Sequence, residues 1–134
     1  MSKLIIYRIG VGDIFSNEAV RVIENASEIN KLVLGTLEEV PLTDELFLVT
    51  SFELNYMHAF ANRVLLKDGE YSRVIFGEAI VVRKNADGVY VNIQDADFDV
   101  IESSLRPVVM YSHARVSYFK EDMKEIATYE FEKS

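Results

Sequence analysis

Three aromatic rings, two amides, an imidazole and a guanidinium fall within a dozen residues, between Phe52 and Arg63. Side chains of these types recognise ligands: aromatic rings stack on nucleobases, amides can read base edges, and arginine holds phosphate through parallel hydrogen bonds. The predicted ligand-binding residues are Phe52, Asn55, Tyr56, His58, Phe60, Asn62 and Arg63. Arg63 is the predicted phosphate anchor because its side chain is always charged and can donate two hydrogen bonds at once.

The same stretch also has a purely structural interpretation. Arg63 would then pair with Glu53, Asn62 would make a turn, and the aromatic rings would lie in the core. For any single residue this interpretation is favoured. For the cluster as a whole we expect a pocket or an interface, since loops rich in polar and aromatic side chains are often functional.

Patterns typical of catalytic and metal sites do not occur elsewhere in the sequence. There is no cysteine, so thiolate chemistry and disulfides are excluded. His58 and His113 lack any metal-ligand spacing, and there is neither a Gly-x-Ser-x-Gly elbow nor a phosphate loop. We therefore predict no metal, no cofactor and no catalytic residues, with a small enzyme as the third-ranked alternative.

Three alternating carboxylates, at Asp95, Asp97 and Asp99, superficially match a calcium loop. Such a loop requires glycine and glutamate where this sequence has Val100 and Arg106. Carboxylates in the first turn of a helix also complement its dipole. The pattern predicts a helix rather than a calcium site.

Composition and charge bound the class of protein. The chain has 134 residues, is 49% hydrophobic and carries a net charge of −8, which suits one domain, residues 1–134, with a true core. A field of this sign disfavours nucleic acid, and no basic stripe occurs. The N-terminal apolar run is too short for a signal peptide or a membrane span. We expect a cytoplasmic protein with no membrane or nucleic-acid partner.

Hydrophobic periodicity predicts a strand-rich domain. Expected strands cover residues 3–9, 19–24, 37–42, 46–52, 78–84, 89–93, 108–111 and 114–119, with a further short segment at residues 71–77. Expected helices follow a capping box at Asn25 and Glu28, ending at Gly35, and cover residues 95–105, which Pro107 stops. The tail, from about Met123, is predicted as a short helix leading into a terminal strand.

Turn residues set the connections. Turns are expected at residues 10–13, 43–45 and 67–69. Asp87-Gly88 predicts a tight hairpin between residues 78–84 and 89–93, because this pair readily adopts left-handed conformations. Altogether the sequence predicts an α+β fold: a single, mostly antiparallel domain with two or three helices.

Several of these segments together resemble a known family. They are Leu37–Val40, Leu46–Val49, Glu53 with Asn62-Arg63, and Ile75–Gly77 continuing into Ala79–Val82. This arrangement resembles a small domain-of-unknown-function family common in bacteriophages and mobile elements of Firmicutes. The likeness covers residues 3–102, which leaves residues 103–134 as a C-terminal extension of strand and helix.

The resemblance implies a phage-type accessory protein acting against bacterial defence in the host cytoplasm. We expect a non-enzymatic binding protein that sequesters a small nucleotide-derived signal. The alternative is an acidic inhibitor that binds a host defence protein; residues 95–134 carry half of the net charge of −8. A strand-rich domain with an open sheet edge also predicts a homo-oligomer.

Overall fold

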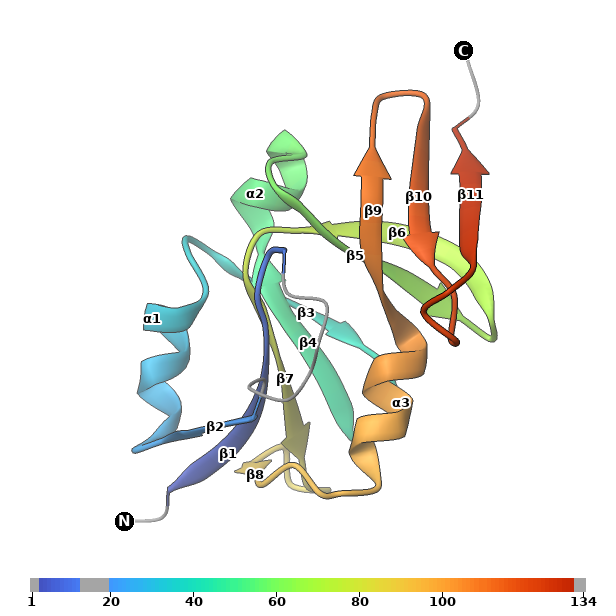
Figure 1. The fold of residues 1–134 in the computed structure, drawn as a ribbon. Helices are drawn as coiled ribbons and strands as arrows, with labels where there is room; N and C mark the ends of the chain where they lie inside the picture. The colour runs from blue at the N-terminus through green and yellow to red at the C-terminus, as the bar shows by residue number, and fades with distance from the viewer. Residues whose placement is uncertain (1–2, 13–19, 132–134) are drawn as a thin grey trace.

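Two antiparallel sheets and three α-helices form the domain in the computed structural model, which describes residues 3–12 and 20–131 (Figure 1). The first sheet has the order β2-β1-β7-β4-β3, with β8 paired to β7. Its strands are β1 (Leu4–Ile9), β2 (Val20–Ile23), β3 (Leu37–Pro41), β4 (Leu46–Ser51), β7 (Ala79–Lys84) and β8 (Tyr90–Val91). The predicted α+β fold is confirmed.

The second sheet has the order β11-β10-β9-β5-β6. Its strands are β5 (Ala61–Lys67), β6 (Glu70–Phe76), β9 (Leu105–Tyr111), β10 (Arg115–Phe119) and β11 (Ile126–Glu130). The helices are the 3₁₀ turn η1 (Ala26–Glu28), α1 (Ile29–Leu32), α2 (Phe52–Met57) and α3 (Asp97–Ser104). The predicted C-terminal extension thus supplies three of the five strands of this sheet.

Alternation along the strands divides the core into three layers, since successive side chains point to opposite faces of a sheet. Leu48 and Val81 face a central layer shared with Leu65 and Ile75 of the second sheet and Ile101 of α3. The opposite face of the first sheet packs against α1. The outer face of the second sheet forms a separate apolar layer that contains Val64, Val74, Phe76 and Val116.

The local signals in the sequence mostly predict the right elements. Asn25 and Glu28 form the predicted capping box: the Asn25 side chain accepts from the Ser27 N–H at 3.0 Å, and Glu28 accepts from the Asn25 N–H at 3.3 Å. The predicted hairpin at Gly88 joins β7 to β8, with Gly88 at φ +76°. Asp13 and Ala19, at the ends of a predicted turn and strand, lie outside the described residues.

Three boundary predictions are wrong. The tail contains no helix among its described residues, because Ile126–Glu130 pairs along its length with β10 as β11. The helix predicted to end at Gly35 ends at Leu32, although Gly35 does adopt a left-handed φ of +75°. Phe52 does not end β4 but begins α2, a helix that the sequence pattern did not indicate.

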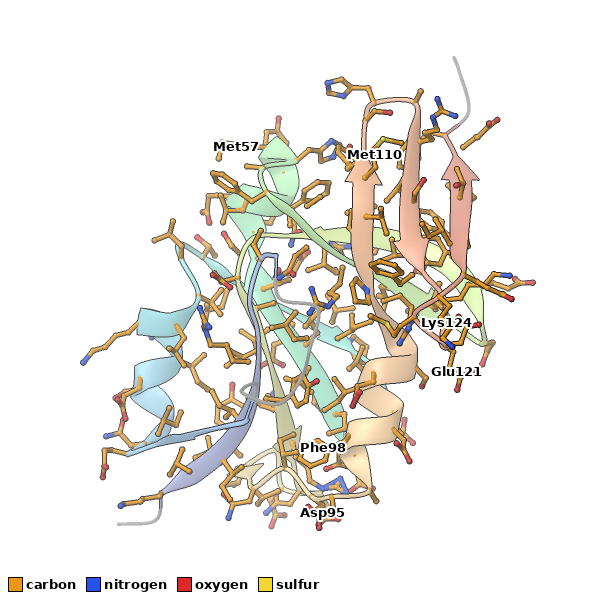
Figure 2. All side chains as sticks on the ribbon, viewed as in Figure 1. Met57, Asp95, Phe98, Met110, Glu121 and Lys124 are labelled. Carbon is orange, nitrogen blue, oxygen red and sulfur yellow. The ribbon has the colours of Figure 1, made fainter. Side chains whose placement is uncertain are left out.

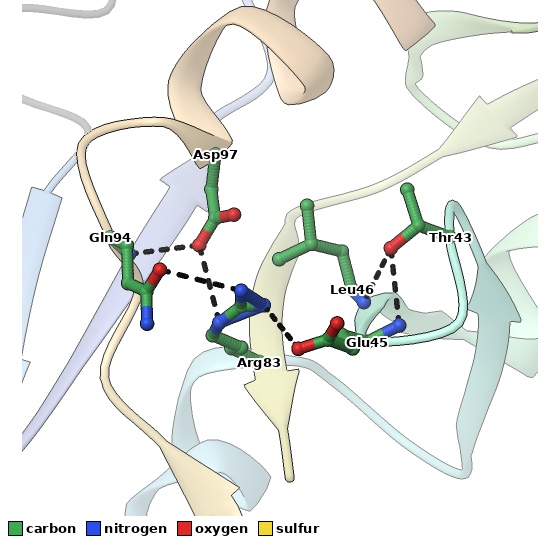
Figure 3. A network of polar contacts seen from close by, with 6 residues as sticks. All are labelled: Thr43, Glu45, Leu46, Arg83, Gln94 and Asp97. Carbon is green, nitrogen blue, oxygen red and sulfur yellow. Dashed lines mark hydrogen bonds and ion pairs between the residues drawn. The ribbon is translucent and has the colours of Figure 1, made fainter.

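A polar network ties the first sheet to α3 (Figure 3). Arg83 on β7 contacts Glu45 at 3.0 Å and the buried Asp97 at 3.7 Å. Asp97 also accepts a hydrogen bond of 2.8 Å from the Gln94 N–H, just before the helix. Asp97 thus lies in the first turn of α3, and its second partner is a guanidinium on the neighbouring sheet.

Candidate functional site

The second sheet curls so that its two edge strands approach each other. Tyr71 on β6 stacks on Tyr129 of β11, with ring centroids 3.8 Å apart and planes 9° from parallel. Figure 1 shows β5 and β6 crossing behind β9, β10 and β11. This curvature makes the outer face of the second sheet concave. Side chains from strands that are distant in sequence meet on that face.

Two β-bulges decide which aromatic residues face this concavity. The β5–β6 register passes from Leu66↔Tyr71 to Leu65↔Arg73, so Ser72 is an extra residue. The bulge brings Tyr71 to the same face as Val74 and Phe76, with which it packs.

The second bulge lies on β9. Its register with β10 passes from Met110↔Ser117 to Val108↔Tyr118, which leaves Val109 as the extra residue. Val108 and Tyr111 therefore share the concave face, although simple alternation would separate them.

The result is a pocket of about 240 Å³ lined mainly by rings. Its lining residues are Asn55, His58, Tyr71, Arg73, Val74, Phe76, Tyr111 and Phe131. The His58 ring stacks on Phe76 at 5.0 Å, and Tyr111 meets the edge of Phe76 at 5.1 Å. Phe131 contacts both tyrosines edge-on at about 6 Å, as favoured aromatic pairs do.

Arg73 is the one cationic residue among those that line this pocket. Its Nη2 lies 3.2 Å from Glu38 Oε1, and about a third of each side chain is exposed. Nε and Nη1 of Arg73 have no partner among the described residues, so the guanidinium retains donors for a ligand. The pocket therefore combines stacking surfaces with one hydrogen-bonding positive charge.

Asn55 fixes the wall of the pocket rather than presenting a free amide. Its Nδ2 donates to Glu38 Oε1 at 3.1 Å and to Thr50 Oγ1 at 3.2 Å. Its Oδ1 accepts from the Phe76 N–H at 2.8 Å. This one side chain joins α2 to β3, β4 and β6, and so positions the helix that carries His58.

Two glycines allow α2 to sit this close to the sheets. A Cβ on Gly77 (φ +82°) would lie 2.4 Å from Leu54 Cδ1, and one on Gly35 would lie 2.4 Å from Glu53 Oε1.

The Glu53 carboxylate accepts from both the backbone N–H and the hydroxyl of Thr36 at 2.7 Å. These bonds hold the pKa of Glu53 below its usual value. Ser51 caps the helix by accepting from the Leu54 N–H.

Asn62 and Arg63 are buried, with exposed fractions of 2% and 9%. Asn62 is the extra residue of a third bulge, on β5, and donates to Ile9 O at 3.0 Å and Gly77 O at 2.8 Å. Arg63 donates to the backbone and side-chain oxygens of Asn62. The alternative pairing of Arg63 with Glu53 is wrong, since the Glu53 carboxylate is bound by Thr36. Neither Asn62 nor Arg63 lines the aromatic pocket.

The remaining predicted residues lie on the outside of α2 (Phe52, Tyr56) and in the loop that follows it (Phe60). Phe52, Tyr56 and Phe60 are 51%, 80% and 69% exposed, and Met57 beside them is 61% exposed. The Phe52 and Tyr56 rings, one helical turn apart, stack at 6.3 Å. We call Phe52, Tyr56, Met57 and Phe60 the α2 crest. The seven predicted residues thus divide among the pocket (Asn55, His58), the buried bulge (Asn62, Arg63) and the crest.

The pocket residues that the sequence did not indicate come from later strands. Tyr71, Arg73, Phe76, Tyr111 and Phe131 are spread over about half the chain and share no motif. Only the curl of the sheet brings them together. Burial, reinforced by the neighbouring Tyr129 and Tyr111, raises the pKa of Tyr71, so its phenol stays protonated and able to donate.

Comparison of the chain with protein-family models, with curated proteins and with solved structures found no match in any of the three. The resemblance to a phage-associated family therefore stays a prediction. Within the described ranges, no three or more His, Cys, Asp or Glu side chains are grouped to hold a metal ion. No helix in that part of the chain combines the length and the apolar character needed to cross a bilayer.

Proposed function

We propose that this protein is a non-enzymatic binding protein that sequesters a small nucleotide-derived molecule in the aromatic pocket. The observation that carries the proposal is the pocket itself: five rings and one guanidinium around about 240 Å³. Stacking of a base on an aromatic side chain contributes about 1–3 kcal/mol. An arginine adds hydrogen bonds and charge for a phosphate.

The size and charge of the pocket limit the ligand. Pockets that enclose drug-sized molecules span roughly 300–1,000 Å³, so this one suits a single base with its sugar. Arg73 provides one positive charge, and a net charge of −8 repels highly charged anions. A mononucleotide or a cyclic mononucleotide fits these limits better than a triphosphate does.

The pocket favours binding over chemistry. Its only imidazole, on His58, is stacked on Phe76 and lies 3.3 Å from the Tyr111 hydroxyl. Among the described lining residues there is no serine, threonine, lysine or carboxylate to act as a nucleophile beside it. If the family resemblance holds, the captured molecule would be a bacterial defence signal in the host cytoplasm.

The test is a thermal-shift and calorimetry screen of the purified protein against nucleoside monophosphates, cyclic mononucleotides and cyclic dinucleotides. A ligand at one hundred times its dissociation constant stabilises the fold by about 2.7 kcal/mol, which raises Tm by several degrees. Arg73→Met should abolish most of that shift. The ligand-free Tm should stay nearly unchanged, because an exposed ion pair contributes about 0–1 kcal/mol.

Arg115→Met is the matched control, because Arg115 is an exposed arginine on β10 that does not line the pocket. It should keep the ligand shift of the parent protein. If no nucleotide shifts the parent Tm, the sequestration proposal fails. The acidic inhibitor of a host defence protein would then be the better proposal, since an inhibitor of that kind needs its target for binding.

A further inference from the structure

We infer that the α2 crest is the contact surface of a homodimer, in which two copies of the chain meet α2 to α2. This inference is independent of the ligand pocket, because none of the four crest residues lines that pocket. Figure 2 shows Met57 on α2 near the same end of the molecule as Met110 on β9, far from Asp95.

Hydrogen bonds and packing hold the helix that carries the α2 crest. Ser51 caps its helix, Asn55 makes three side-chain hydrogen bonds, and Leu54 fits against Gly77. The chain after the helix is held in left-handed conformations at His58 (φ 54°) and Phe60 (φ 65°). Non-glycine residues adopt this region only at an energetic cost, which the surrounding structure must offset. Exposed aromatics held this way point to a partner surface.

The exposed aromatic area of the crest is about half of what each partner contributes to a standard dimer interface. Together the exposed fractions of Phe52, Tyr56 and Phe60 equal about two whole aromatic side chains. At about 200 Å² each, this is roughly 400 Å² before Met57 is added. A standard interface takes about 800 Å² from each partner, with aromatic residues and methionine enriched at its centre. The crest would supply that centre.

The charge of the crest favours a second copy over a basic partner. None of the four crest residues is acidic, and the neighbouring Glu53 carboxylate already accepts from Thr36, so this surface offers little to a cationic partner. An identical apolar crest is complementary to it by two-fold symmetry. The β3 edge of the first sheet is less suited, because β3 carries Glu38, Glu39 and Pro41, which discourage edge pairing.

Sedimentation equilibrium of the ligand-free protein at several NaCl concentrations tests this inference. We expect a species of twice the 15.3 kDa monomer mass. Its association should strengthen with salt, because salt screens the repulsion between two copies of charge −8. A contact based on charge attraction would weaken instead.

Tyr56→Lys should raise the dimer dissociation constant roughly 30-fold, the effect expected of a central aromatic anchor. The substitution lowers the net negative charge, so general electrostatics would act in the opposite direction. Val89→Lys is the matched control: Val89 is also exposed but lies in the β7–β8 turn, at the opposite end of the molecule (Figure 1). It should leave the dimer intact.

Phe60→Asn provides a second variant, because asparagine tolerates the left-handed conformation at this position. It should also weaken the dimer, with an unchanged circular dichroism spectrum. A monomer at every concentration would overturn the inference and leave the crest to a different protein. If Tyr56→Lys and Phe60→Asn both leave the dimer dissociation constant unchanged, the inference is overturned as well, since the dimer interface would then lie elsewhere.

Discussion

Gly77→Ala tests whether the close approach of α2 to the sheets builds the site. At φ +82° an alanine is strained by about 1–2 kcal/mol, partly offset by about 0.4–1 kcal/mol from the stiffer unfolded chain. Its Cβ would also lie 2.4 Å from Leu54 Cδ1, so the leucine and its helix must shift. Overpacking of this kind costs about 1–3 kcal/mol more. These contributions add to a loss of roughly 1–5 kcal/mol, about 3 kcal/mol at their midpoints.

Gly88→Ala separates the two contributions. Gly88 has nearly the same backbone conformation, φ +76°, but nothing lies within 4 Å of its added Cβ. It should lose only about 1 kcal/mol, the backbone part of the cost. Urea denaturation of both variants gives the comparison directly. Equal losses in the two variants would refute the claim that Leu54 closes on Gly77.

A double-mutant cycle with Leu54→Ala identifies the partner. Removing the Leu54 side chain should relieve the clash, so Leu54→Ala and Gly77→Ala together should cost about 1–2 kcal/mol less than the separate losses added. Because α2 carries Asn55 and His58, Gly77→Ala should also weaken any ligand found for the pocket. If the losses in unfolding free energy of the two single variants simply add in the double variant, Leu54 does not pack against Gly77.

Two further predictions concern the second sheet. The buried Arg106 side chain donates to the backbone carbonyls of Glu102, Phe119 and Lys120. In urea denaturation, Arg106→Met should therefore lower the unfolding free energy by about 3 kcal/mol or more, whereas Arg115→Met, at an exposed arginine, should lower it by less than about 0.5 kcal/mol. Similar losses in the two variants would contradict the proposed role of Arg106 in joining these segments. Because the pKa of Tyr71 is raised, the folded state binds the phenol proton more tightly than the unfolded state does. The protonated phenol therefore contributes its full stabilisation below about pH 10, and this contribution is lost as pH rises through the folded-state pKa. The unfolding free energy of Tyr71→Phe should therefore fall less steeply above pH 10 than that of the parent, and parallel profiles would count against burial of this phenol.

Local signals in the sequence determined much of the secondary structure. The capping box at Asn25 and the turn at Gly88 are decided by side chains within a few residues of each other, so their physics is visible in a short window. The apolar runs of β4 and β7 likewise predicted strands, and the structure buries side chains on both faces of each. The stretch from Phe52 to Arg63 stands out in the sequence by its composition, and the structure distributes its residues over the pocket, the buried bulge and the α2 crest.

The tertiary structure alone decided the site. Bulges at Asn62, Ser72 and Val109 each shift the alternation by one residue, and their positions depend on pairing with strands far away in sequence. Without them, Tyr71 and Tyr111 would be expected to face away from the pocket. The curl that brings β6 against β11 depends on the whole sheet. The sequence therefore indicated most of the strands, although not β5, whereas long-range pairing determined which side chains meet.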